Sequence, residues 1–155
     1  MSSEGLARLD VWRKAKEYAL LVYKEALPKL PPEEKWNLSQ QIRRAAQSIP
    51  ANIAEGYGRF YFQETIRFCY VARGSLDETL SHLALAFELG YLPEPSYGLL
   101  IKTGDDLIKL INGYIAYLKK VRLGASEPGS PNSIHEPGEI YDSQMPPETM
   151  EDAGI

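Results

Sequence analysis

The sequence predicts an all-α protein: an antiparallel, up-down four-helix bundle over residues 1–123, followed by a disordered acidic tail over residues 124–155. Three observations support this prediction. Apolar residues recur at spacings of three and four in four long segments, which is the period of an amphipathic helix. No segment shows the sustained apolar–polar alternation of a strand. Prolines and glycines separate the four segments by short connections, which favour antiparallel neighbours in a bundle.

The first helix is expected over residues 10–30. Asp10 is a candidate N-cap, because its carboxylate can accept a hydrogen bond from a free backbone N–H. Prolines at 28, 31 and 32 should end the helix, since proline lacks a donor and clashes with the preceding turn. Its apolar stripe comprises Trp12, Ala15, Ala19, Val22 and Ala26, widened by Tyr18 and Leu21.

The second helix is expected to start near Pro32, with early carboxylates at Glu33 and Glu34 that suit the positive end of the helix dipole. Pro50 lies inside the pattern and should kink the helix and free the carbonyl of Ala46. Gly56 and Gly58 mark its end. The stripe of this helix consists of Leu38, Ile42, Ala45, Ile49 and Ile53.

The third helix is expected over residues 61–89 and the fourth over residues 96–121, with Gly90 ending the third and Pro93 and Pro95 delaying the fourth. The third helix has a stripe of Phe62, Ile66, Cys69, Leu76, Leu80, Leu83 and Phe87. The fourth has two heptad series, Leu100, Leu107, Tyr114 and Val121, and Gly104, Ile111 and Leu118. Such a and d positions predict side-by-side packing of the helices.

Charge divides the chain into two parts. The net charge is −4, but residues 1–123 hold all 17 basic and 14 of the 21 acidic residues, a net charge of +3. Residues 124–155 hold seven acidic residues, five prolines and no Lys or Arg. Such a segment buries too little apolar surface to offset its ordering entropy, so it is expected to be disordered. It is either a solvated tail or a segment that competes with an anionic partner of a mildly basic bundle.

The sequence offers no enzyme active site, and we expect no catalytic residue, no bound metal and no cofactor. Cys69 is the single cysteine, which excludes an internal disulfide, and it lies in an apolar stretch typical of the core. Glu78 and His82 are four residues apart without the second copy that a di-iron bundle needs. The chain shows neither a signal peptide nor a membrane-length apolar run, so a cytoplasmic location is expected.

The stretch Gln40–Gly58 carries polar groups beside its apolar stripe. Ser48, Asn52 and Glu55 follow one another at helical spacing near Pro50, with Ser75 and Glu78 as candidate partners on the third helix. Either these groups satisfy backbone atoms freed by the proline and join the two helices, or they form a polar binding site. We favour the structural interpretation, because a kinked helix leaves polar groups that must be paired.

Five arginines are the candidate binding residues: Arg43, Arg44, Arg59, Arg67 and Arg73. Tyr57, Tyr61 and Tyr70 lie between them. Arginine beside tyrosine is typical of an RNA surface that combines phosphate contacts with base stacking. The same residue types are enriched at oligomer interfaces, so the sequence leaves both interpretations open.

The runs QQIRRAAQSIPANIAEGYGR, ARGSLDET and ELGYL, within residues 40–92, closely resemble the signatures of the 23S rRNA intervening-sequence proteins. The resemblance extends over about residues 9–121. The motif positions here are Ser48, Pro50, Asn52, Glu55, Gly56, Ser75 and Glu78. It implies a four-helix bundle that tends to form a homopentamer, in a family of which some members are encoded inside bacterial 23S rRNA genes. Related bundles are accessory proteins of diversity-generating retroelements that work with a reverse transcriptase and RNA.

Together the residues and the resemblance lead to a first hypothesis of a non-enzymatic, ring-forming bundle that binds structured RNA or a ribonucleoprotein. The second hypothesis is a protein-interaction scaffold, or an accessory subunit of a reverse transcriptase without RNA specificity of its own. An enzyme is the third, and it lacks a nucleophile, a metal set or an acid–base pair in the sequence.

Overall fold

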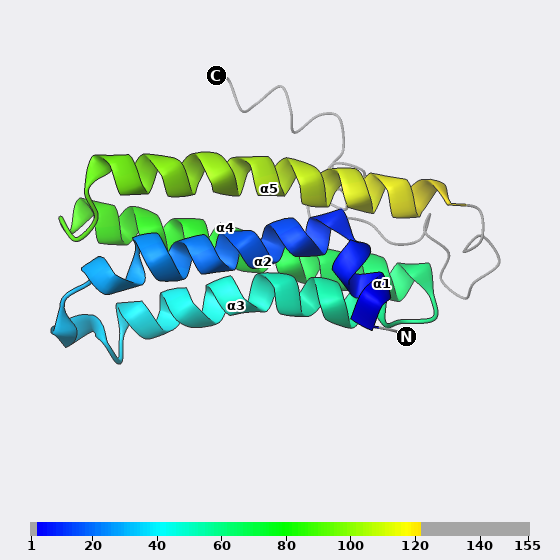
Figure 1. The fold of residues 1–155 in the computed structure, drawn as a ribbon, viewed down its shortest axis with the longest axis horizontal. Helices are drawn as coiled ribbons and strands as arrows, with labels where there is room; N and C mark the ends of the chain where they lie inside the picture. The colour runs from blue at the N-terminus through cyan, green and yellow to red at the C-terminus, as the bar shows by residue number, and fades with distance from the viewer. Residues whose placement is uncertain (1–2, 122–155) are drawn as a thin grey trace, which may run out of the picture.

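The computed structural model describes residues 3–121, and the expected acidic tail at 124–155 lies outside them. Four long helices dominate: α2 (Asp10–Glu25), α3 (Leu38–Tyr57), α4 (Phe62–Glu88) and α5 (Glu94–Lys120) (Figure 1). A short helix, α1 (Ser3–Arg8), precedes them. The all-helical prediction is therefore confirmed, and no strand occurs within the described part of the chain.

Successive long helices run in opposite directions (Figure 1). Hydrogen bonds between α3 and α4 confirm their antiparallel direction. Gly56, near the end of α3, bonds to Thr65 near the start of α4, and Ser48, in the middle of α3, bonds to Ser75 in the middle of α4. Each long helix packs on two neighbours, α2 on α3 and α5, and α4 on the same two helices. The α3–α4 connection, the end of α5 and α1 therefore all lie at one end of the bundle.

The start of the bundle differs from expectation. Helix α1 was not predicted, and it packs against α2, with Gly5 beside the Tyr57 hydroxyl of α3. The N-cap position of α2 is Leu9 in an extended conformation, so the predicted cap at Asp10 is wrong. Asp10 lies inside the first turn instead, where its carboxylate pairs with Arg13 at 2.9 Å.

The connection between α2 and α3 is longer than expected. Helix α2 ends at Glu25, and two 3₁₀ turns, Leu27–Lys29 and Pro32–Glu34, replace the last turn of one predicted helix and the first turn of the next. Each 3₁₀ turn has a proline near its first position. Proline is tolerated there, but it cannot continue a preceding α-helix because it has no backbone N–H. Helix α3 begins only at Leu38, where the Glu34 carboxylate accepts a hydrogen bond from the Leu38 backbone N–H at 3.1 Å.

The α4–α5 connection follows the predicted glycine signal. Gly90 has φ of +81° and donates its N–H to the Phe87 carbonyl, while Tyr91 donates to the Ala86 carbonyl. This pair of bonds is a Schellman motif, in which glycine adopts the left-handed conformation at low cost. Helix α5 begins two residues before the predicted Ser96, because Pro95 is tolerated in a first turn.

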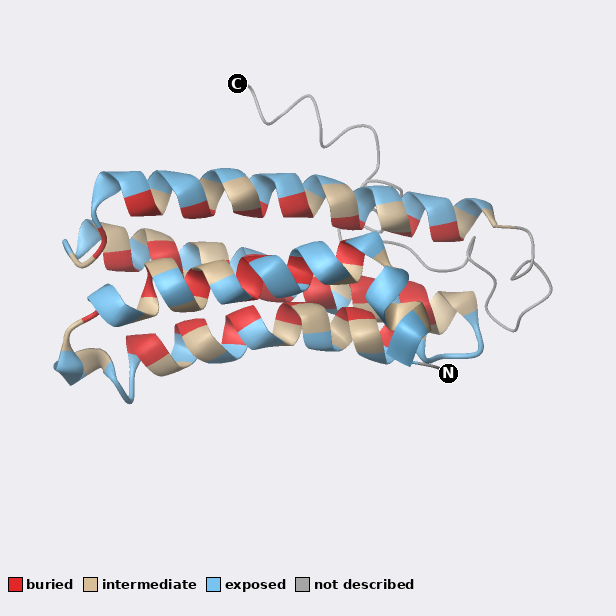
Figure 2. Ribbon diagram, viewed as in Figure 1, coloured by how far each residue is buried: buried red, intermediate tan, exposed pale blue. Residues whose placement is uncertain are grey.

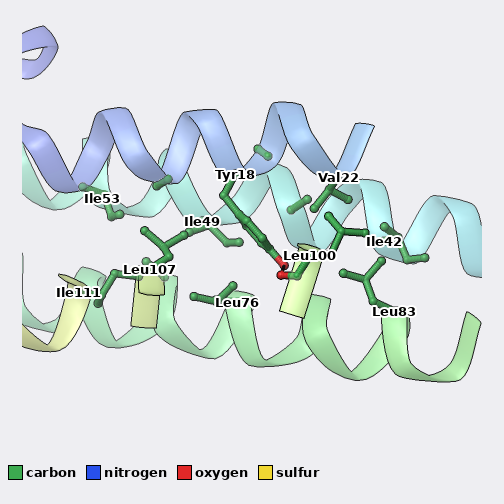
Figure 3. Packing of buried hydrophobic residues seen from close by; sticks show 14 of the residues in the cluster. Tyr18, Val22, Ile42, Ile49, Ile53, Leu76, Leu83, Leu100, Leu107 and Ile111 are labelled. Atoms are coloured by element: carbon green, nitrogen blue, oxygen red, sulfur yellow. Dashed lines mark hydrogen bonds between the residues drawn. The ribbon is translucent and has the colours of Figure 1, made fainter. Parts of the chain in front are cut away.

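The buried faces of the four helices converge on one core (Figure 2). Every residue of the predicted α3 stripe is buried, and the α5 heptad positions Leu100, Gly104, Leu107, Ile111 and Leu118 are buried as well. Tyr18 is fully buried, and its hydroxyl donates to the Leu100 carbonyl at 3.2 Å, which joins α2 to α5 (Figure 3). Helix α4 approaches α5 closely at Gly104, because a Cβ there would lie 2.7 Å from Leu80 Cδ2.

Candidate functional site

A polar seam joins α3 to α4 where the sequence motif predicted one. Asn52 Nδ2 donates to the Ser48 carbonyl at 2.7 Å and lies 2.8 Å from Ser48 Oγ. Ser75 Oγ of α4 lies 2.8 Å from Ser48 Oγ and 3.1 Å from the Val71 carbonyl. Thr79 Oγ1 then donates to the Ser75 carbonyl. The seam is a closed set of hydrogen bonds between two helices, which is how buried polar side chains are normally satisfied.

The two glutamates of the motif lie outside this seam. The Glu55 carboxylate accepts from Arg59 at 2.6 Å, and the Glu78 carboxylate faces His82 at 3.3 Å, both on exposed helix surface. The expectation that Glu55 shares a polar cluster with Ser48, and that Glu78 serves as its partner, is therefore wrong. Each glutamate lies four residues before its partner, Arg59 or His82, so the two side chains can pair without crossing to the adjacent helix.

Gly56 lets α3 and α4 approach closely at the end of the seam. Its carbonyl accepts a hydrogen bond from Thr65 Oγ1 at 2.9 Å. A Cβ on Gly56 would lie 2.7 Å from Phe68 Cβ, closer than real Cβ atoms come, and 3.1 Å from the Thr65 carbonyl oxygen, which is a tight contact. The backbone of the next helix therefore occupies the space that any side chain at position 56 would need.

Replacing Gly56 by alanine should lower the free energy of unfolding by roughly 1–3 kcal/mol, the usual cost of overpacking. In an open helical site the same change stabilises by about 1 kcal/mol. Gly74 of α4 offers such a site as a control, because nothing lies within 4 Å of a Cβ placed there. Urea unfolding of the two variants should give changes of opposite sign, and a stabilised Gly56→Ala variant would contradict the close approach.

Charge is unevenly distributed along the bundle. Each long helix can be divided at its middle, after Glu17, Gln47, Ser75 and Leu107. The half that contains the α3–α4 connection and the end of α5 then holds ten basic and five acidic described residues, a net charge of +5. The opposite half holds six basic and nine acidic described residues, a net charge of −3. The basic half is thus a suitable face for an anionic partner.

Aromatic side chains lie among the cations of this basic end. The Tyr70 ring has the Arg73 guanidinium 5.2 Å and the Lys119 ammonium 5.6 Å from its centroid. The Phe68 ring has the Arg59 guanidinium at 5.0 Å. Phe60, in the α3–α4 connection, is 84% exposed and packs edge-to-face on Tyr61. Accessible aromatic rings and cations on one surface are the elements from which single-stranded and looped nucleic acid is recognised.

A surface hollow of about 310 Å³ lies at the same end. It is lined by Arg59, Glu64, Arg67, Phe68 and Val71, the last 51% exposed. Arg59 is paired with Glu55, whereas Arg67 forms no ion pair with any residue from 3 to 121. The hollow therefore combines an apolar wall with one compensated and one uncompensated guanidinium.

The five candidate arginines do not form a single cluster. Arg59, Arg67 and Arg73 belong to the basic end, where Arg73 also donates to the Asn112 side chain of α5 at 2.8 Å. Arg43 and Arg44 lie on the first turns of α3, and Arg44 is about 20 Å along the helix from its end at Tyr57, at 1.5 Å per residue. Phe60, Phe68 and Val71 also lie at this basic end and were not predicted as site residues, because nothing in the local sequence distinguishes them from core residues.

Buried titratable groups do not form a reactive centre among the described residues. Burial raises the pKa of the Cys69 thiol from 9.0 to about 12, so Cys69 stays protonated at neutral pH and is a poor nucleophile. Within residues 3–121 no group of three or more His, Cys, Asp or Glu side chains is placed to hold a metal ion. No helix in this range is both long and apolar enough to cross a membrane.

The fold and the site together define a small antiparallel four-helix-bundle protein with a basic, aromatic end. Residues 7–113 match the 23S rRNA-intervening sequence protein family, and the chain belongs to this family. A solved structure from Bacteroides thetaiotaomicron, described as a protein of unknown function from the S23 ribosomal protein family, is similar to this chain at 26% identity and a TM-score of 0.62. The similarity covers 68% of this chain and 97% of that one. No curated protein matches the sequence.

Proposed function

We propose that this protein is a non-enzymatic bundle that binds structured RNA, alone or in a ribonucleoprotein, through its basic end. The observation that carries the proposal is the charge distribution, +5 on one half of the described bundle and −3 on the other. Phosphate contacts supply most of the affinity for nucleic acid, and a one-sided charge orients the protein on its partner.

The side chains at this end fit the two requirements of RNA recognition. Arg59, Arg67 and Arg73 offer guanidinium groups for phosphates, and Lys119 adds a fourth cation beside Tyr70. The exposed rings of Phe60 and Tyr61 offer stacking surfaces for unpaired bases. Because phosphate contacts carry little sequence information, this surface suits loops and bulges better than a defined duplex sequence.

Self-assembly would strengthen such binding. We propose a homopentamer, the assembly that family membership suggests, in which five copies of residues 1–123 carry a combined charge of +15. Several weak basic surfaces held in one particle bind a long polyanion with higher avidity than one surface does. Light scattering on the purified protein tests the assembly independently of RNA.

Titration of a labelled structured RNA at two salt concentrations tests the proposed function. Replacing both Arg59 and Arg67 by glutamine should weaken binding several-fold and reduce the slope of log affinity against log salt by about one per lost phosphate contact. Replacing both Arg43 and Arg44 by glutamine is the matched control, because it removes the same charge from the acidic half. Equal losses in the two double variants would contradict a binding surface at the basic end.

A protein partner is the second candidate function, favoured by the exposed apolar side chains Phe60 and Val71, which are 84% and 51% exposed. Single exposed apolar residues are common, but two near one hollow with Arg59 and Arg67 resemble the centre of a protein interface. If the protein ignores RNA at low salt but captures a reverse transcriptase or another protein partner in a Phe60-dependent manner, the scaffold is the better description.

A further inference from the structure

We propose that the acidic C-terminal segment of this chain docks on its own basic end, with residues 139–142 seated in the hollow formed by Arg59, Glu64, Arg67, Phe68 and Val71. The segment reads Glu-Ile-Tyr-Asp, two apolar residues between two acidic ones. The hollow offers partners for both residue types, an apolar surface of Phe68 and Val71 and the guanidinium groups of Arg59 and Arg67. The docking would make the anion-binding surface self-regulated.

Charge complementarity is the first argument. After Arg122 the chain has seven acidic residues and no Lys or Arg, while the end of the bundle from which it emerges has a net charge of +5. The Glu64 carboxylate opposes the docking, and Glu55 already compensates Arg59 at 2.6 Å. Arg67 has no such pairing with a described residue and is the principal cation for the incoming carboxylates.

Chain connectivity is the second argument. Helix α5 ends at Lys120 on the same end of the bundle as the α3–α4 connection that carries Arg59 (Figure 1). Seventeen residues lie between Val121 and Glu139, and an extended chain of that length spans up to about 60 Å. A tethered segment has an effective concentration in the millimolar range, so even a weak individual contact is substantially occupied.

The regulatory consequence rests on the proposed function, whereas the docking itself does not. If RNA phosphates and the segment's carboxylates both use Arg67, the two exclude each other. RNA must then displace the segment, which lowers the apparent affinity and favours ligands that offer many phosphates at once.

Disulfide trapping in the full chain tests the docking. Val71→Cys is paired with Ser143→Cys, which lies next to Asp142 and leaves residues 139–142 intact. Leu85→Cys paired with the same Ser143→Cys is the control, because Leu85 lies on the same helix with 50% exposure against 51% for Val71. The two sites are about 21 Å apart along α4 at 1.5 Å per residue, and both lie within reach of the segment. Cys69 is fully buried and does not compete.

Under a glutathione redox buffer, the Val71 pair should form its intrachain disulfide faster than the Leu85 pair even without docking, because Val71 lies nearer to the end of α5. Docking adds a component that depends on the two carboxylates, so adding Glu139→Gln and Asp142→Asn should slow the Val71 pair roughly tenfold and leave the Leu85 pair unchanged. An unchanged rate of the Val71 pair in that variant, or cross-links only between chains, would overturn docking within one chain.

Added structured RNA separates the two proposals. If both hold, RNA slows trapping of the Val71 pair and leaves the Leu85 pair unchanged. If trapping of the Val71 pair depends on Glu139 and Asp142 but RNA does not slow it, the docking is retained and the shared use of Arg67 is overturned. If RNA binding depends on Arg67 but the two carboxylates do not affect trapping, the proposed function is retained and the docking is overturned.

Discussion

Replacing Leu83 by alanine should lower the free energy of unfolding by roughly 2–5 kcal/mol. Leu83 is completely buried on α4 and belongs to the core that all four long helices share. Alanine favours the helix at least as well as leucine, so the loss reports packing rather than helix propensity. Urea unfolding followed by circular dichroism measures it.

Leu85→Ala provides the matched control, because Leu85 lies two residues further along the same helix and is 50% exposed. Its effect should stay within about 0.5 kcal/mol, as for most surface substitutions. A similar loss in both variants would mean that the outer face of α4 is also buried, for example between subunits. Repeating the measurement over a range of protein concentrations distinguishes burial in a subunit interface from burial in the core.

Alkaline pH should also destabilise the protein strongly. Burial raises the pKa of Cys69 from 9.0 to about 12, and it raises the pKa of Tyr18 above 10.0, with a smaller contribution from the Asp105 carboxylate. In the unfolded chain the thiol loses its proton near pH 9 and the phenol near pH 10, whereas both stay protonated in the folded core. The unfolded state therefore binds fewer protons above pH 9, and stability falls as pH rises.

Each group contributes about 1.4 kcal/mol per pH unit over its window, so the free energy of unfolding should drop by roughly 2–3 kcal/mol from pH 8.5 to 10.5. Cys69→Ala separates the two groups, because the thiol accounts for most of the change between pH 9 and 10 and the phenol for most of its increase above pH 10. Its stability should be flatter in that interval than the wild type's. Parallel pH profiles for the two proteins would show that the Cys69 thiol is not shielded from solvent in the folded state.

The core could be predicted from the sequence because residues on one face of a helix recur every three or four positions. Ile42, Ile49 and Ile53 are buried as their spacing predicts, and Gly90 takes the left-handed conformation that its position at a helix end favours. Helix ends were less predictable. Asp10 and Pro32 both have the residue type of a helix start, yet Leu9 and Asn37 occupy the N-cap positions of α2 and α3. Several nearby residues satisfy the same capping rule, and packing selects among them.

The candidate site could be predicted only in part. Ser48, Asn52 and Ser75 meet as expected, because a polar side chain beside a buried stripe must find a partner on the adjacent helix. Glu55 and Glu78 share the same helical spacing but remain on the surface, where Arg59 and His82 are within reach. Spacing along a helix places a residue on a face without deciding whether a neighbouring helix covers that face.

The helical class, the core stripes, the polar seam between the second and third long helices and the family can all be predicted from spacing along one element or from a contiguous motif. The grouping of charges cannot, because charge acts through space and the order of residues along the chain does not show which helix ends lie together. Antiparallel packing brings Arg59, Arg67 and Arg73 to the same end as Lys119, while Arg43 and Arg44 lie in the oppositely charged half.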